Sequence, residues 1–145
     1  MLKEQFEDVL AEFGEVVKQP LTLDDDGTAT FTIDDEIIVN LQYLEESDAV
    51  VAFAPVGGFG GTDASDAGEK ALELLRMNEL GGTTEGFTLA LDEDADLVLA
   101  MDRHSALEFA DADSLAAWID ALVRAVRSVR NRFAELFPSE EEGRE

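Results

Sequence analysis

His104 is the only histidine in the chain, and there is no cysteine. Histidine is the side chain that ordinarily titrates near neutral pH, so a Ser–His dyad or a multi-histidine metal site would depend on this one residue. His104 lies between Arg103 and Ser105, where we predict the end of a strand. We therefore expect no enzyme, no metal and no cofactor. An enzyme with an acidic active site is the alternative, and a His104→Ala substitution would test it.

Three aspartates at alternate positions match the first three ligands of a calcium-binding loop: Asp92, Asp94 and Asp96. The sixth position of such a loop requires glycine and the twelfth a carboxylate, but this chain has Leu97 and Arg103 there. The pattern therefore predicts an acidic hairpin turn instead of a calcium site. The run from Asp24 to Gly27 is interpreted in the same way.

A glycine-rich stretch, Gly57 to Gly61, lies between a predicted strand and a predicted helix, where a phosphate-binding loop would be found. The dinucleotide fingerprint needs glycine at the position of Asp63, and no Gly-Lys-Ser/Thr sequence follows. Asp63 and Asp66 would also repel a phosphate at the start of the helix. We predict a flexible connecting loop.

A short basic strip recurs every third residue on the last predicted helix: Arg124, Arg127 and Arg130. Such a strip is usually a solvated helix face that pairs with acids on the same helix, here Asp120. Docking of a partner is the alternative.

The chain is strongly acidic, with 34 Asp and Glu against 10 Lys and Arg and a formal net charge of −24. This charge would repel a phosphate backbone or an anionic membrane, so we expect no nucleic-acid and no membrane partner. Four interpretations of the acidity remain open: solubility, adaptation to a salty cytoplasm, recruitment of a basic partner, and an acidic decoy for nucleic-acid-binding proteins. The N-terminus has no leader pattern, and no apolar run reaches the ~18 residues of a membrane span. We expect a cytoplasmic protein.

The predicted elements follow from hydrophobic periodicity. A first helix, with apolar residues from Leu2 to Val17, stops before Pro20. Strands are expected at 28–33, 37–44, 49–56, 87–91 and 97–101. A second helix is expected at about 67–80, with a capping box of Asp66 and Glu69 at its start and an end at Gly81-Gly82. A last helix is expected from Asp113 or Ser114 to about Leu136. The order α-βββ-α-ββ-α predicts an α+β fold, an antiparallel sheet packed with helices. We expect one domain at 1–137 and a disordered acidic tail at 138–145.

Two of the predicted strands carry apolar residues on both faces. In the strand at 37–44, Ile38 and Leu44 lie opposite the main apolar face, and in the strand at 49–56, Val51 and Phe53 do so. The outer face must then be covered, by a helix of the chain or by a partner. The second helix spreads its apolar residues around most of its circumference, which predicts either a dimer interface or burial between the sheet and the last helix.

The arrangement resembles the class I type III secretion chaperones of the CesT/Tir-chaperone family over about Phe6 to Arg132. The resemblance rests on these segments: 6–14, 20–27, 31–34, 38–41, 71–78 with its Leu-Leu-x-x-Asn pattern, 86–92 and 96–99. Two features depart from the family pattern. The Gly57–Gly61 loop is unusually rich in glycine, and the last hairpin lacks the common glycine.

The resemblance implies a homodimer that binds the N-terminal segment of a secreted effector and keeps it competent for export, without ATP or metal. The expected effector contacts are Phe6, Leu10, Ile38, Leu44, Val51 and Phe53. The expected dimer contacts are Leu72, Leu75, Met77 and Leu89. The alternative is a YbjN-like regulatory protein-binding domain of the same fold that is not tied to secretion.

Overall fold

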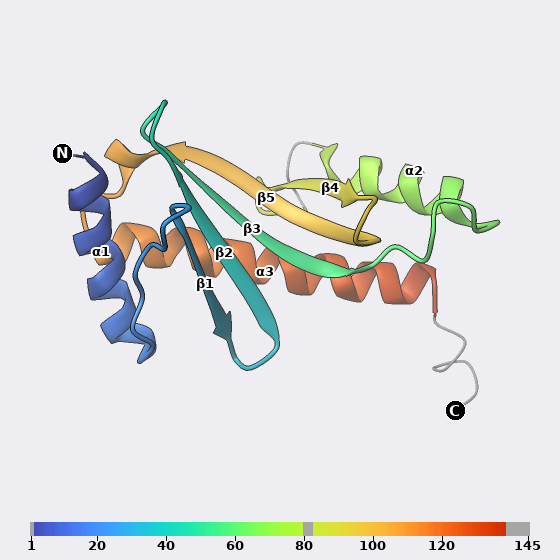
Figure 1. Cartoon of the computed structure of the whole chain (residues 1–145). Coiled ribbons are helices and arrows are strands. Elements are labelled where there is room, and N and C mark those ends of the chain that lie inside the picture. Colours follow the sequence, from blue (N-terminus) through green and yellow to red (C-terminus); the bar gives the residue numbers. More distant parts are fainter. Residues whose placement is uncertain (1, 80–82, 139–145) are drawn as a thin grey trace.

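The computed structural model describes residues 2–79 and 83–138 and contains one sheet with helices (Figure 1). The elements in chain order are α1 (Leu2–Val17), β1 (Thr28–Ile33), β2 (Ile37–Leu44), β3 (Ala49–Gly58), α2 (Ala67–Met77), β4 (Thr88–Asp92), β5 (Leu97–Ser105), the short 3-10 helix η2 (Ala106–Glu108) and α3 (Ala112–Leu136). The predicted order and the α+β class are confirmed. Within the described ranges, no helix has both the length and the apolar character needed to cross a membrane. Apart from Pro138, the predicted tail lies outside the described residues, as does the predicted helix end at Gly81-Gly82.

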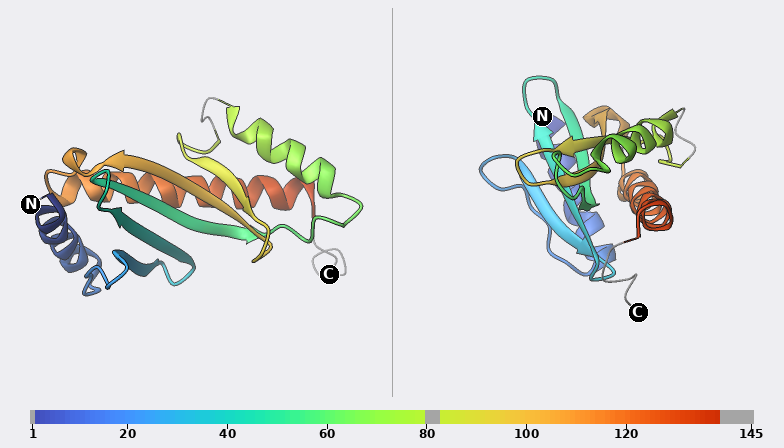
Figure 2. Two further views of the ribbon diagram at one scale, coloured as in Figure 1. Left: turned by 45° about the horizontal axis from the view of Figure 1, so that its top comes forward. Right: turned by 90° about the vertical axis from the view of Figure 1, so that its right-hand side faces the viewer.

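The five strands form one antiparallel sheet in the order β1-β2-β3-β5-β4. The long α3 runs along one face of this sheet, and α1 packs near the start of α3 (Figure 1). The helix α2 lies beside β4 at one edge (Figure 2). In both figures, no described helix lies over the opposite face of the sheet. The sequence did not decide whether a helix of the chain or a partner covers the outer face of the sheet. In the described residues, no helix covers it.

The core lies between the sheet and α3. Alternate residues of β2 point toward the helix, and Ile37, Val39 and Leu41 are completely buried. They belong to the same buried cluster as a stripe of α3 whose members are spaced by three or four residues: Leu115, Ile119, Leu122, Val126 and Val129. The helix buries a residue at every third or fourth position, and the strand buries every second residue, as expected from their periods of 3.6 and two residues. Truncating one such leucine to alanine costs about 2–5 kcal/mol in protein cores.

The second helix begins at Ala67 as predicted, but the caps at the starts of α2 and α3 differ from the predicted ones. The capping box predicted at Asp66 is wrong, because the Asp66 carboxylate makes no cap hydrogen bond and instead pairs with Lys70 at 3.3 Å. The helix α3 does begin with a capping box, formed by Asp111 and Ser114. The Ser114 N–H donates to Asp111 Oδ1 at 2.9 Å. Because the third position is serine rather than Glu or Gln, the sequence signature did not reveal it.

The glycine loop is held in place by the hairpin between β4 and β5. The N–H groups of Gly60 and Gly61 donate to the Asp96 carboxylate at 3.1 and 2.9 Å. The Phe59 N–H donates to the Asp96 carbonyl at 2.9 Å. The loop that we expected to be flexible is therefore fixed by hydrogen bonds. The Gly60 and Gly61 amides, which could have bound a phosphate, bind the Asp96 carboxylate instead.

Candidate functional site

The uncovered face of the sheet carries a strip of apolar side chains, which we call the open face: Ile38, Val51, Phe53, Leu99 and Met101. Phe53 is paired with Asn40 on one side and with Met101 on the other, so the strip crosses from β2 through β3 to β5. Ile38 is 48% exposed, and the other four are partly buried by their neighbours. A row of apolar side chains on a solvent-exposed sheet face is typical of a contact surface.

The structure divides the expected effector contacts into three groups. Ile38, Val51 and Phe53 lie together on the open face, whereas Leu44 lies at the end of β2, beside the recess described below. Phe6 and Leu10 are core residues of α1, with exposed fractions of 2% and 0%.

The burial of α1 has a specific cause. The Phe6 ring lies 5.7 Å from Tyr43 and 6.1 Å from Phe109, centroid to centroid. Helical periodicity identified the apolar stripe of α1 but not the partner that covers it. In this structure that partner is the chain itself, so Phe6 and Leu10 are not surface contacts.

The expected dimer contacts also divide into two groups. Met77 and Leu89 are buried within the chain, together with Leu74, whereas Leu72 and Leu75 are 48% and 68% exposed. The wide spread of apolar residues on α2 is thus explained by two faces. One face packs against the chain's own core, and the other, Leu72 and Leu75, is left uncovered among the described residues.

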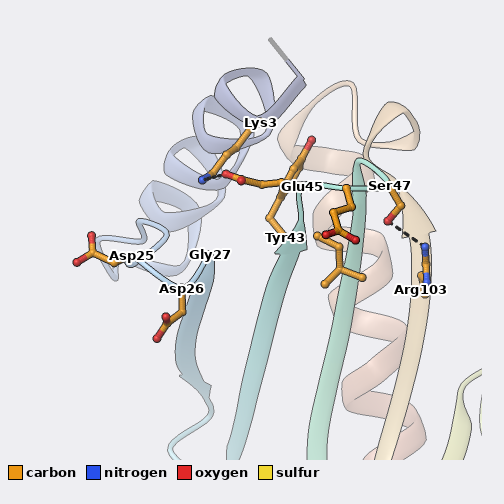
Figure 3. A pocket seen from close by; sticks show the side chains of 10 residues that line it. Lys3, Asp25, Asp26, Gly27, Tyr43, Glu45, Ser47 and Arg103 are labelled. Carbon is orange, nitrogen blue, oxygen red and sulfur yellow. Dashed lines mark hydrogen bonds and ion pairs between the residues drawn. The ribbon is translucent and has the colours of Figure 1, made fainter.

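A wide recess of about 670 Å³ lies at the end of the sheet beside α1 (Figure 3). Its lining residues are Lys3, Asp25, Asp26, Gly27, Tyr43, Leu44, Glu45, Glu46, Ser47 and Arg103. Its two cations are engaged, Lys3 with Glu45 at 2.5 Å and Arg103 with the Ser47 hydroxyl at 3.0 Å. The hydrogen bond to Glu45 raises the pKa of Lys3 above its ordinary value. The recess is a charged surface feature whose cations are held by neighbouring side chains.

The phenol of Tyr43 lies at the edge of this recess and donates to Asp48 Oδ1 at 2.7 Å. Burial, and then the hydrogen bond to Asp48, raise the pKa of Tyr43 to about 12. Tyr43 therefore acts as a neutral donor that closes the β2–β3 hairpin.

His104 lies between two carboxylates and contacts both of them. Its Nε2 lies 2.8 Å from Asp102 Oδ2 and its Nδ1 lies 2.7 Å from Glu108 Oε2. The ring contacts Trp118 edge-to-face at 5.1 Å, and the Trp118 indole N–H donates to the same Asp102 oxygen at 3.0 Å. The cluster joins β5, η2 and α3. In the part of the chain that the structure describes, no three His, Cys, Asp or Glu side chains are arranged so that they could hold a metal ion.

The arginine strip is not the locally paired face that we predicted. Arg124 pairs with Glu85 at 3.1 Å, and Arg127 pairs with Asp34 and Glu36 in the β1–β2 turn. The hydrogen bond to Asp34 raises the pKa of Arg127 above its ordinary value. The predicted pairing with Asp120 is wrong because these side chains reach across to the loops of the sheet rather than along their own helix.

The fold and its open face can be compared with known proteins. The model of the Tir chaperone protein (CesT) family matches residues 8–130, and the chain belongs to this family. Among curated proteins, none matches the sequence at a significant level.

Several solved structures share the fold. A chain of the HopA1-SchA chaperone-effector complex is 20% identical with a TM-score of 0.70, and the match covers 89% of this chain and 95% of that chain. A chain of the ExsC-ExsE complex is 18% identical with a TM-score of 0.73, over 89% and 93%. The structure of the Yersinia pestis type III secretion chaperone SycH with a stable fragment of YscM2 contains a chain that is 23% identical with a TM-score of 0.63, over 85% and 98%.

Proposed function

We propose that this protein is a non-catalytic chaperone that binds the N-terminal segment of a type III secreted effector and keeps it competent for export. The observation that carries the proposal is the open face, an apolar strip that no described helix of the chain covers. Membership of the CesT family and the likeness to chains from chaperone–effector complexes support the same function.

An extended polypeptide fits this surface physically. A segment crossing the sheet at Phe53 would place apolar side chains against Phe53 and its cross-strand neighbour Met101, while the intervening side chains face solvent. Burying apolar area contributes about 25 cal/mol per Å². Part of this gain is offset by the entropy of ordering the segment, which favours reversible release.

The working form that we propose is a cytoplasmic homodimer. Leu72 and Leu75 on the outer face of α2 are the proposed contacts between the two copies, and Met77 and Leu89 support this face from beneath. The function that we propose requires no ATP, metal or cofactor, because holding an extended segment involves no change in covalent bonds.

The test is co-purification of a client with variants of the open face. The tagged wild-type protein is expressed in its native host, and the co-purifying protein and its protease-protected segment are identified by mass spectrometry. Phe53→Glu places a charge in the centre of the strip and is expected to abolish co-purification. Gln42→Glu, on the same face of β2 but outside the apolar strip, is the matched control and is expected to retain the client.

Each outcome is informative. Both variants are first shown to be folded by their thermal unfolding. Retention of the client by Phe53→Glu at the wild-type level would exclude the open face as the binding surface. The absence of any co-purifying effector with the wild-type protein would argue against the proposed function itself.

A further inference from the structure

An apolar pocket of about 180 Å³ lies at the end of β3, and we call it the Gly57 pocket. Figure 1 shows this end of the strand beside the C-terminal half of α3. The pocket is lined by residues of β3, β5 and α3, and three of these are buried valines: Val56, Val98 and Val129. Its inner surface therefore belongs to the core of the chain.

The pocket exists because Gly57 has no side chain. Gly57 is paired with Val98 across the ladder, and residues directly opposite each other in an antiparallel pair point to the same face of the sheet. Because Val98 is buried on the α3 side, a side chain at position 57 would point into the same space. A Cβ atom at Gly57 would meet no atom within 4 Å, and Gly57 does not adopt a positive φ. The backbone could therefore carry a side chain there without strain.

The walls of the pocket carry two aromatic rings and a cation. The rings of Phe133 and Phe137 lie 5.1 Å apart, centroid to centroid, with an angle of 51° between their planes. The Arg130 guanidinium is fixed beside them, because it donates to the carbonyls of Val56 and Pro55 at 2.6 and 3.3 Å. Aromatic rings attract one another in offset and edge-on contacts, and guanidinium groups stack on aromatic faces. These groups favour an aromatic ligand over an aliphatic one of the same size.

Volume and charge limit the ligand further. An apolar cavity of about 150 Å³ stays dry and binds benzene. A pocket of about 180 Å³ therefore suits a molecule with one aromatic ring. The net charge of −24 disfavours an anionic ligand, whereas the π-face of an uncharged ring is attracted to the positive charge of Arg130. The pocket is thus complementary to a single uncharged ring.

Neither the rest of the chain nor a second copy supplies such a ring. The segment from Ser139 to Glu145, which follows the described residues, contains carboxylates but no apolar side chain. In residues 2–79 and 83–138, the large apolar side chains that are exposed are those of valine, leucine and isoleucine only. A second copy would therefore present no exposed ring from these residues. The ring must come from a different molecule.

We propose that the Gly57 pocket binds a small, uncharged aromatic molecule whose ring contacts Phe133, Phe137 and the Arg130 guanidinium. The inference goes beyond the proposed function, because the pocket lies on the α3 side of the sheet and the open face lies on the other. The glycine-rich stretch from Gly57 to Gly61 is also one of the two features in which the sequence departs from the family pattern. The pocket is therefore a property of this chain rather than of the shared fold.

The probe is phenol, titrated into the isotope-labelled full-length protein and followed by NMR, and it should shift the amide signals of Gly57, Val98 and Phe133. Cyclohexanol has the same size but no π-face, and it should bind on the order of fivefold more weakly. Benzoate, an anionic ring, should also bind more weakly than phenol. Gly57→Leu places a side chain in the pocket and should abolish phenol binding. Thr30→Leu, which adds the same side chain at an exposed position of β1, is the matched control and should bind phenol as the wild type does.

Thermal unfolding first shows whether both variants are folded. Wild-type affinity of a folded Gly57→Leu protein for phenol would overturn the inference, and so would shifted amides that all lie outside the pocket. Equal affinities of the wild-type protein for phenol and cyclohexanol, or tighter binding of benzoate, would contradict the class of ligand. These wild-type measurements decide the matter even if Gly57→Leu does not fold. None of them involves a client, so failure at the Gly57 pocket is distinguishable from failure of the proposed function.

Discussion

The Arg130 guanidinium donates to the Val56 carbonyl at 2.6 Å, which ties the C-terminal half of α3 to the end of β3. A second bond reaches the Pro55 carbonyl at 3.3 Å. The bonds join residues more than 70 positions apart in the sequence, and they hold the end of the strand that carries Phe53. The open face is therefore supported from the opposite side of the sheet by a helix side chain.

Replacing Arg130 with methionine should lower the free energy of unfolding by about 1–3 kcal/mol, because two partly buried carbonyls lose their donor. Arg124→Met is the matched control. Within residues 2–79 and 83–138, Arg124 pairs with exposed Glu85 alone, and its loss should change stability by no more than about 1 kcal/mol. Urea denaturation of both variants measures the difference. Equal effects would show that the carbonyl contacts of Arg130 add nothing to stability.

The single tyrosine gives a specific spectroscopic signal at high pH. Burial and the Asp48 hydrogen bond raise the pKa of Tyr43 to about 12 from 10.0, so its phenolate should form only near pH 12 in the folded protein. A folded pKa above the unfolded one means that Tyr43 adds stability fully below pH 10, and this contribution is lost as pH rises toward 12. Tyrosinate absorbance measures the midpoint. A midpoint near 10 in the folded protein would refute this placement, and Asp48→Asn should lower the midpoint only in part because burial remains.

The outer face of α2 predicts the oligomeric state. Leu72→Glu places a carboxylate in the proposed contact between two copies, and it should convert dimers to monomers because a charge would be buried without a partner. Leu107→Glu, which changes a 71% exposed leucine of η2, should leave the dimer intact. Sedimentation velocity distinguishes these outcomes. A folded Leu72→Glu protein that still sediments as a dimer would place the interface elsewhere.

Gly14 is required for the turn that positions Gln19. A Cβ atom at Gly14 would lie 2.6 Å from the Gln19 carbonyl oxygen, and the Gln19 N–H donates to the Gly14 carbonyl at 2.9 Å. Gly14→Ala should therefore destabilise the protein by about 1–3 kcal/mol through overpacking. Gly68→Ala, in α2 with no atom within 4 Å of its Cβ, should be neutral or stabilising by up to about 1 kcal/mol. Thermal unfolding of the pair is the measurement, and a neutral Gly14→Ala would contradict the close approach.

The sequence predicted the elements well where a periodic pattern was long. The stripe of α3 and the alternation in β2 recovered both elements and the residues that pack between them. The stop of α1 before Pro20 also follows from local chemistry, and there Lys18 adopts a positive φ of 59°. Local rules sufficed because these features depend on residues close in the chain.

Features that depend on distant residues were not predictable. Arg127 pairs with Asp34, which is 93 residues away, and no local pattern indicates that pairing. Periodicity also could not separate Phe6, which the chain buries, from Phe53, which lies on the open face, because both are apolar residues on amphipathic elements. The same holds for the hydrogen bonds that the side-chain amides of Gln19 and Asn78 make with the main chain of Thr32 and Leu89, since these residue types carry no sequence signal for a sheet edge.

Site-specific photocrosslinking tests most directly whether the open face holds the client. A benzophenone amino acid is placed at position 53, in the centre of the apolar strip, and in a second protein at position 107 on η2. Position 53 is predicted to crosslink to the co-purified effector segment, and position 107 is not. Crosslinking from position 107 with none from position 53 would contradict the claim.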